Sequence, residues 1–219
     1  MASLTIENYI KTIYVLAEVD ERKPVATGAI AQRLSVAPGT VTSMLKTLRE
    51  SGLADYEPYE GVALTDSGRA LALRVLRRHR LIETFLVNTL KLNWDEVHDE
   101  AENLEHAVSD FLIDRIDEFL GFPETDPHGT PIPKRDGTVH KLKTIPLSEL
   151  KTGATFRLKQ VDEQEPEFLK YVSSIGLEIG KAGVLLERNP TAGTISIDVD
   201  GNVSTFSEDT GSKFQVIPG

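Results

Sequence analysis

Apolar side chains recur at three- and four-residue steps through the first part of the chain, and this spacing predicts helices. The expected helices cover residues 4–18, 27–34 and 38–51. The third opens with Pro38, which suits a first helical turn because its missing N–H would have no partner there. Gly52 follows it, as expected for a left-handed residue just after a helix.

After Gly52 the apolar period changes to two. Residues 53–57 and 62–65 therefore read as two short strands of a hairpin around residues 58–61. A further helix begins at residues 65–68 and runs through a basic segment with arginines at positions 74, 77, 78 and 80. Helix, short helix, helix and hairpin is the order of a winged helix-turn-helix.

A longer helix is expected from the capping box of Asn93 and Glu96 to about Leu120. Its apolar stripe has heptad-like steps: Val97, Ala101, Leu104, Val108, Leu112, Ile116 and Leu120. So regular a stripe suits packing against a partner helix, either from a second subunit or from the preceding helix.

The rest of the chain has a different character. Residues 121–143 are rich in Pro, Gly and Thr and are typical of a linker. Beyond them, period-two segments near 156–158, 183–187, 195–199 and 214–216, with one short helix near 167–174, indicate a small β-barrel. The fold class is therefore mainly α with a small β domain.

The distribution of charge matters more than the net charge of −10. Residues 1–80 hold 11 basic and 9 acidic side chains, whereas residues 81–122 hold 2 and 11. The N-terminal part of the chain can therefore contact the phosphates of a nucleic acid. The acidic segment, taken by itself, is equally typical of a solvated helix face.

Composition excludes some classes of protein. The chain has no cysteine, so a metal must be held by His, carboxylate, amide or backbone ligands. The sequence has no apolar run of about 20 residues and its N-terminus lacks the pattern of a signal peptide. We therefore expect a cytoplasmic protein without a membrane partner.

The helix pair 27–51 is a candidate DNA-reading element. Such a helix enters the major groove with its N-terminal residues against base edges, while hydroxyls, amides and cations hold phosphates. The alternative is an ordinary helical hairpin. The candidate contacts are Thr27, Ala37, Pro38, Gly39, Thr40, Thr42, Ser43 and Lys46.

A group of histidines and carboxylates forms a candidate metal site. On one continuous helix His98, Glu102, Glu105 and His106 would share a face, and His79 and Glu83 are another i, i+4 pair upstream. Three imidazoles and three carboxylates suit Mn(II), Fe(II), Co(II) or Zn(II). The alternative is a pair of solvated helix faces.

An enzymatic use of the same ligands is disfavoured. Di-iron carboxylate sites draw on four helices, and only two ligand-bearing helices are expected in this chain. The sequence also lacks a Gly-rich phosphate loop, a nucleophile elbow and a His-Glu-x-x-His motif. We therefore expect no enzyme.

Three segments together resemble a known family: residues 78–83 (RHRLIE), residues 97–110 (VHDEAENLEHAVSD) and residues 127–133 (PHGTPIP). The chain is similar, over essentially its whole length, to the diphtheria-toxin-repressor family of metal-dependent transcriptional repressors. The resemblance implies a homodimer on operator DNA and a C-terminal SH3-like domain shared with a ferrous-transport accessory protein. The expected domains are a winged helix-turn-helix (1–73), a metal-binding and dimerisation region (74–122), a linker (123–144) and the SH3-like domain (145–219).

The resemblance also implies two metal sites. The effector site would use Asn8, Glu102, Glu105 and His106. The second would use His79, Glu83 and His98, with contributions from the linker residues Asp126 and His128 and from Glu163 or, further along, Glu167.

The metal preference follows from the same resemblance. Iron-sensing members have Cys where this chain has Glu102, so the harder ligand set favours Mn(II). Asn8 and Lys11 depart from the manganese-type pattern, in which some members have carboxylates at these positions.

A switching hypothesis follows. Without metal, the carboxylates would repel one another and the first helix would not be tied to the dimerisation core. A bound cation would draw Asn8 toward the other ligands. This movement would fix the spacing of the two recognition helices of the dimer. The alternative function is a winged-helix regulator whose effector is not a metal.

Overall fold

The computed structural model describes residues 3–19 and 24–219, which separate into two compact units. The first unit holds the described residues up to His79 together with residues 105–108 and 133–138. The second unit holds residues 80–104, 109–132 and 139–219.

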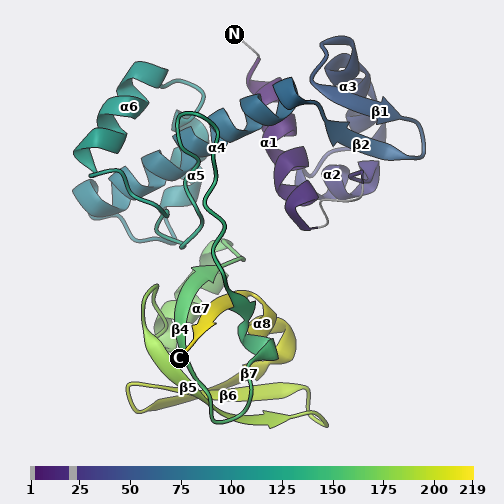
Figure 1. The fold of residues 1–219 in the computed structure, drawn as a ribbon. Coiled ribbons are helices and arrows are strands. Elements are labelled where there is room, and N and C mark those ends of the chain that lie inside the picture. Colours follow the sequence, from purple (N-terminus) through teal and green to yellow (C-terminus); the bar gives the residue numbers. More distant parts are fainter. Residues whose placement is uncertain (1–2, 20–23) are drawn as a thin grey trace. The chain divides into compact units, whose positions relative to one another are not determined.

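The first unit has the predicted winged helix-turn-helix order. The hairpin lies beside the third helix, and the first helix contacts both the second helix and the hairpin (Figure 1). Its elements are α1 (Leu4–Val19), α2 (Thr27–Arg33), α3 (Pro38–Glu50), β1 (Ala54–Glu57), β2 (Gly61–Leu64) and the first part of α4 (Asp66–Phe85). The core of this unit consists of buried apolar side chains from all of these elements, among them Ile10, Ile13, Ile30, Val41, Leu45, Leu48, Ala54, Val62 and Val75.

Local chemistry sets the ends of α3. Ala37 adopts an extended conformation before the helix, and Pro38 occupies its first turn, as predicted. Gly52 has a φ of +69°, the left-handed conformation expected just after a helix. The α2–α3 connection turns at Ser35, whose φ of 53° lies in the same region.

The predicted continuous helix from Asn93 to Leu120 is wrong. This region holds two helices, α5 (Val97–Leu104) and α6 (Asp110–Phe119), and a turn of π-helix (Leu86–Leu90) precedes it. Ser109 caps α6, because its Oγ accepts a hydrogen bond from the backbone N–H of Leu112 at 3.2 Å. The break also explains why the heptad stripe is not one buried seam: Leu112 is 46% exposed, whereas its neighbour Ile113 is fully buried.

The predicted linker has no helix or strand, but part of it is firmly packed. Within the turn 126–130, the carbonyl of His128 accepts a hydrogen bond from the backbone N–H of Val161 at 2.9 Å. Gly129 has a φ of +84°, and a Cβ there would lie 1.9 Å from the carbonyl oxygen of Lys159. Only glycine fits this close approach to the strand that follows.

The C-terminal part of the second unit is a six-stranded antiparallel sheet in the order β3-β8-β4-β5-β6-β7, with α7 and α8 packed beside it (Figure 1). This arrangement agrees with the predicted SH3-like domain. The elements are β3 (Ile145–Pro146), a 3-10 turn (Leu147–Glu149), β4 (Thr155–Val161), α7 (Pro166–Ser174), β5 (Ala182–Asn189), β6 (Thr194–Val199), β7 (Asn202–Ser207), α8 (Glu208–Ser212) and β8 (Phe214–Pro218). Its core includes Phe156, Leu158, Leu169, Ile197 and Phe214.

Candidate metal centres and nucleic-acid face

Glu105 is the centre of a polar cluster in the first unit. Its side chain is fully buried in the turn after α5. One carboxylate oxygen, Oε1, lies 2.6 Å from Lys11 Nζ of α1, and the other, Oε2, lies 2.6 Å from His79 Nδ1 of α4. The carboxylate therefore joins two helices through short, charge-assisted hydrogen bonds.

His106 extends this cluster to a carboxylate that the sequence did not single out. Its Nδ1 lies 2.7 Å from Oε2 of Glu7, which is 7% exposed on α1. Its Nε2 lies 3.3 Å from Glu105 Oε1 and has no hydrogen-bond partner among the described residues. Asn8, the predicted first-helix ligand, is half-buried, and its Oδ1 likewise has no such partner in the described part of the chain.

The Glu7 side chain could have been found from the sequence. Glu7, Ile10 and Tyr14 share the inward face of α1, at i, i+3 and i+7. A carboxylate on an apolar stripe is almost never buried without a partner, so its position signals a polar site.

Glu83 is the centre of a second cluster, in the second unit, and is fully buried on α4. Its Oε1 lies 3.5 Å from His98 Nδ1, and its Oε2 lies 3.7 Å from His128 Nδ1. Glu102, one turn after His98 on α5, has its Oε1 3.8 Å from His98 Nε2. In the first unit, His79 contacts Glu105.

Asp126 and His128, the predicted linker ligands, lie at this second cluster. Asp126, His128 and Glu83 are buried together, with one ligand atom of each within 4.8 Å of the others. Asp126 Oδ1 accepts hydrogen bonds from the backbone N–H groups of His128 and Thr130, at 2.8 and 2.9 Å.

Electrostatics at the second cluster follow from burial. Desolvation, assisted by the charge of Glu83, raises the pKa of Asp126 above its ordinary value. Burial is the largest influence on the pKa of His128 and lowers it, but Glu83, Asp126 and the carbonyl of Trp94 together outweigh burial, so that this pKa is raised above its ordinary value. Arg80 contributes positive charge, with its Nε 3.8 Å from Asp126 Oδ2.

Two predicted C-terminal ligands lie apart from this group. The Glu163 carboxylate accepts a hydrogen bond from the backbone N–H of Glu165 at 3.3 Å, and its other oxygen lies 3.5 Å from Lys213 Nζ. Glu167 has a side chain that is 90% exposed and pairs with Lys170.

The expectation that His98, Glu102, Glu105 and His106 share one helical face is wrong, because α5 ends at Leu104. The chain turns before Glu105 and His106, so these two side chains belong to the cluster around α1. His98 and Glu102 remain on α5, where His98 lies near Glu83.

The donor sets fit a small divalent cation. Ligand atoms held about 2.0–2.2 Å from such an ion lie roughly 3–3.5 Å from one another. The 3.3 Å between His106 Nε2 and Glu105 Oε1 matches this spacing, and the 3.7 Å between His128 Nδ1 and Glu83 Oε2 is close to it. The second distance is too long for a hydrogen bond. All the ligand atoms are nitrogen or oxygen, as suits Mn(II), Fe(II) or Zn(II).

Most of the predicted DNA-reading residues lie in the first two turns of α3 or just before it, whereas Thr27 begins α2 and Lys46 lies further along α3. Ala37, Pro38, Gly39, Thr40, Ser43 and Lys46 are exposed, and Thr27 and Thr42 are half-exposed. The hydroxyls of Thr42 and Ser43 donate to backbone carbonyls one turn earlier, at 3.1 and 3.0 Å, which leaves their oxygens available as acceptors. A hollow of about 520 Å³ lies beside this helix and the turn of the hairpin, lined among others by Thr42, Lys46 and the fully exposed Tyr59.

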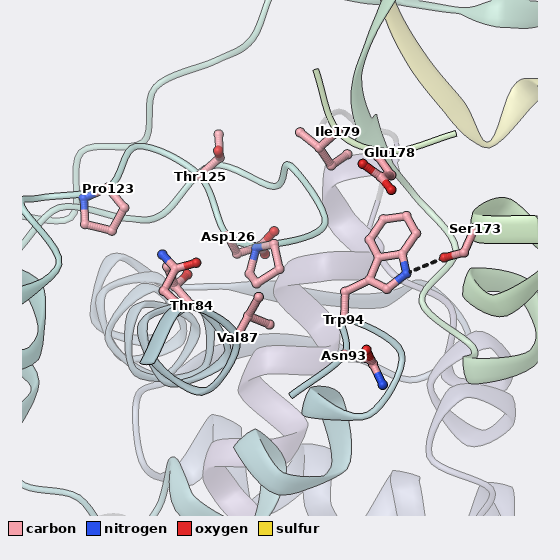
Figure 2. Close-up of a pocket in the computed structure, with 12 residues that line it drawn as sticks. Thr84, Val87, Asn93, Trp94, Pro123, Thr125, Asp126, Ser173, Glu178 and Ile179 are labelled. Carbon is pink, nitrogen blue, oxygen red and sulfur yellow. Dashed lines mark hydrogen bonds between the residues drawn. The ribbon is translucent and has the colours of Figure 1, made fainter. Parts of the chain in front are cut away.

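A pocket of about 430 Å³ lies in the second unit, beside the second cluster (Figure 2). Figure 2 shows the indole of Trp94 at its edge, donating a hydrogen bond from Nε1 to Ser173 Oγ at 2.9 Å. The same ring stacks on the imidazole of His128, with 5.9 Å between ring centroids. Trp94 therefore connects a candidate ligand with the β domain.

A winged helix-turn-helix joined to buried histidine and carboxylate clusters defines a class, the metal-responsive DNA-binding regulators. Three family profiles cover nearly the whole chain: the iron-dependent repressor N-terminal DNA-binding domain (residues 1–62), the iron-dependent repressor metal-binding and dimerisation domain (65–134) and the FeoA domain (145–216). The chain belongs to the iron-dependent repressor family, which includes the diphtheria toxin repressor.

Individual relatives agree with this assignment. The chain is 32% identical to the iron-dependent repressor IdeR of Mycobacterium leprae over 210 residues, which is 90% of each protein. It is also similar to a solved manganese-dependent transcriptional repressor in complex with manganese, with 41% identity, a TM-score of 0.89 and coverage of 97% and 99%. A crystal structure of ScaR with bound Zn²⁺ has 32% identity, a TM-score of 0.82 and coverage of 97% and 98%. Among residues 3–19 and 24–219, no helix is both long and apolar enough to cross a membrane.

Proposed function

We propose that this chain is a cytoplasmic transcriptional repressor that binds operator DNA as a homodimer when loaded with Mn(II), or with Fe(II) as a second choice. The observation that carries the proposal is its full-length similarity to a manganese-dependent repressor, combined with a buried ligand cluster free of sulfur. Relatives of this family are regulators of transcription, and we propose no enzymatic activity for this chain.

The proposed domains keep the boundaries expected from the sequence, at 1–73, 74–122, 123–144 and 145–219. We assign Glu105 and His106 to the effector site, with Asn8 and Glu102 as further ligands and Glu7 as an added candidate. The second site takes Glu83, His98 and the linker residues Asp126 and His128, with His79 on the same helix as Glu83. The buried clusters described above support Glu105 and His106 in the first set and Glu83, His98, Asp126 and His128 in the second. Asn8, Glu102 and His79 are carried over from the family resemblance, since His79 contacts Glu105 and Glu102 lies near His98. Glu163 is the least supported of the ligands, because its carboxylate contacts Lys213.

The effector site can act on the DNA-reading helix through contacts inside the first unit. Glu105 and His106 contact Lys11 and Glu7 on α1, and α1 packs against α2, which in turn packs against α3. A bound divalent cation supplies positive charge between the carboxylates of this cluster. The position of α1 therefore influences the recognition helix, and differential affinity of the metal for the DNA-competent arrangement gives the switch.

A homodimer is supported by apolar side chains on α6 and the segment after it. Four of them are exposed to 46% or more: Phe111, Leu112, Phe119 and Phe122. Exposed apolar groups gathered on one short helix are typical of a surface that a partner covers. We propose that the partner is a second copy of this chain, which would present the two recognition helices to successive major grooves.

The test is binding of the full-length protein to duplex DNA selected from a random library with the Mn(II)-loaded protein. Fluorescence anisotropy should give an affinity at least about tenfold higher with Mn(II) than with a chelator, a typical size for allosteric coupling. Titration with Fe(II) and Zn(II) ranks the metals. Equal affinity with and without metal would refute the metal-dependent function, and a monomer on size-exclusion chromatography with light scattering would refute the dimer.

A further inference from the structure

Lys11 places a cation inside the effector cluster. Its side chain is only 11% exposed, and its Nζ lies 2.6 Å from Glu105 Oε1. Lysine side chains are rarely this buried unless the ammonium is paired. The position on α1 is one turn after Glu7, whose carboxylate contacts His106.

The oxygen that Lys11 contacts is also one of the two atoms between which we expect a metal ion to bind. Glu105 Oε1 is the carboxylate atom 3.3 Å from His106 Nε2, the spacing of two ligands around one ion. The other oxygen, Oε2, is engaged by His79 Nδ1 at 2.6 Å. An ion bound between Oε1 and His106 would lie within a few ångströms of the Lys11 ammonium, where two positive charges repel strongly at reduced dielectric.

We propose that Lys11 is a resident cation that competes with the metal ion for Glu105 Oε1 and thereby raises the metal concentration at which the effector site fills. This inference rests on the proposed function, because it assumes that Glu105 and His106 bind metal. Lys11 is thus a residue that sets the threshold of the sensor without being a ligand. When the site fills, the ammonium leaves Oε1 and can move toward solvent, since lysine has a long and flexible side chain.

The test compares two substitutions at Lys11 with a matched control in the full-length protein. Lys11→Met removes the charge and keeps much of the apolar stem, Lys11→Arg keeps the charge, and Lys151→Met removes a charge from an exposed position in the β domain. Isothermal calorimetry with Mn(II) and with Zn(II) gives the dissociation constant, and thermal unfolding in chelator gives the stability of the metal-free protein.

We expect Lys11→Met to bind Mn(II) at least about tenfold more tightly than the unmodified chain, since a like charge near the ion has been removed. The same variant should unfold at a lower temperature in chelator, because Glu105 has lost its cation. Lys11→Arg and Lys151→Met should bind Mn(II) with an affinity close to that of the unmodified chain.

Weaker or unchanged metal binding by Lys11→Met would overturn the proposal and make Lys11 a structural tie between α1 and Glu105. If Lys11→Met does not fold, Lys11→Arg still tests the idea, because a charge-retaining variant that binds metal much more tightly contradicts competition. Failure of the proposed function has a different outcome: neither the unmodified chain nor any variant would bind Mn(II), and Glu105→Gln would leave calorimetry unchanged.

Discussion

Replacing Glu105 by Gln is the most informative single perturbation, because this carboxylate is fully buried and has two short contacts. Lys11 Nζ and His79 Nδ1 both lie 2.6 Å from its oxygens. A hydrogen bond to a charged group contributes about 1.5–3 kcal/mol, and breaking a buried ion pair costs about 3–5 kcal/mol. The amide keeps one acceptor oxygen, so we expect the metal-free protein to lose about 2–4 kcal/mol of its free energy of unfolding.

The assay is urea denaturation and thermal unfolding in chelator, repeated with Mn(II). A loss of this size lowers the unfolding temperature of a chain of about this length by roughly 5–15 °C. Glu187→Gln, at an exposed position of β5, is the matched control. The reasoning is refuted if Glu105→Gln unfolds within about 1 kcal/mol of the unmodified protein, or if Mn(II) stabilises the two proteins equally.

Four further predictions test other parts of the structure. Ser109→Ala removes the cap of α6 and should lower the free energy of unfolding by about 0.5–2 kcal/mol in urea titrations; no change would contradict the helix break. Lys46→Ala should weaken DNA binding by a similar factor for every duplex sequence and reduce the slope of log affinity against log salt by about one; a change confined to one base position would indicate base reading instead. Because the pKa of His128 is raised and a metal requires the neutral imidazole, Zn(II) affinity should fall as the pH drops through and below neutrality, with proton release measured by calorimetry in two buffers; pH-independent binding would exclude His128 as a ligand. Trp94 is the only tryptophan, so its fluorescence should respond to Mn(II) in the unmodified chain and lose that response in His128→Ala; an unaltered response would place the reporting metal elsewhere.

The winged helix-turn-helix could be predicted because its signals are local. Pro38 at the start of α3, Gly52 after it and the change of apolar period at the hairpin each depend on residues close in sequence. The β domain could be predicted in the same way, because apolar and polar residues alternate along β4, β5, β6 and β8. Strand β7 (Asn202–Ser207) was missed, because much of it is polar and exposed and it pairs only with β6 at one edge of the sheet.

The break between α5 and α6 was missed because the heptad stripe continues across it. The step from Leu104 to Val108 fits a single helix as well as two helices joined by a turn. Ser109 followed by Asp110 was the available signal, since serine is a preferred cap and an acidic residue favours a first turn. The break matters for function, because Glu105 and His106 lie in the turn after α5 and not on the helix itself.

The partners of the candidate ligands could not be predicted, because they are distant in sequence. The contacts of Glu105 with Lys11 and of His106 with Glu7 span more than 90 residues. Spacing on a helix can show that side chains share a face, but not which side chain of another helix they meet. Asp126 and His128 came from the resemblance alone, and their burial depends on how the turn 126–130 packs against β4.

Contacts between residues distant in sequence also change the hypothesis of the switch. A count of charges along the chain isolates an acidic segment at residues 81–122 and suggests repulsion among its carboxylates. A compensating cation comes from outside that segment, because Lys11 on α1 contacts Glu105. Lys11 already links α1 to Glu105, so metal is not needed to join them. In the proposed competition with Lys11, the metal ion displaces a resident cation rather than simply relieving repulsion, and the sensitivity of the sensor depends on the difference between the two interactions.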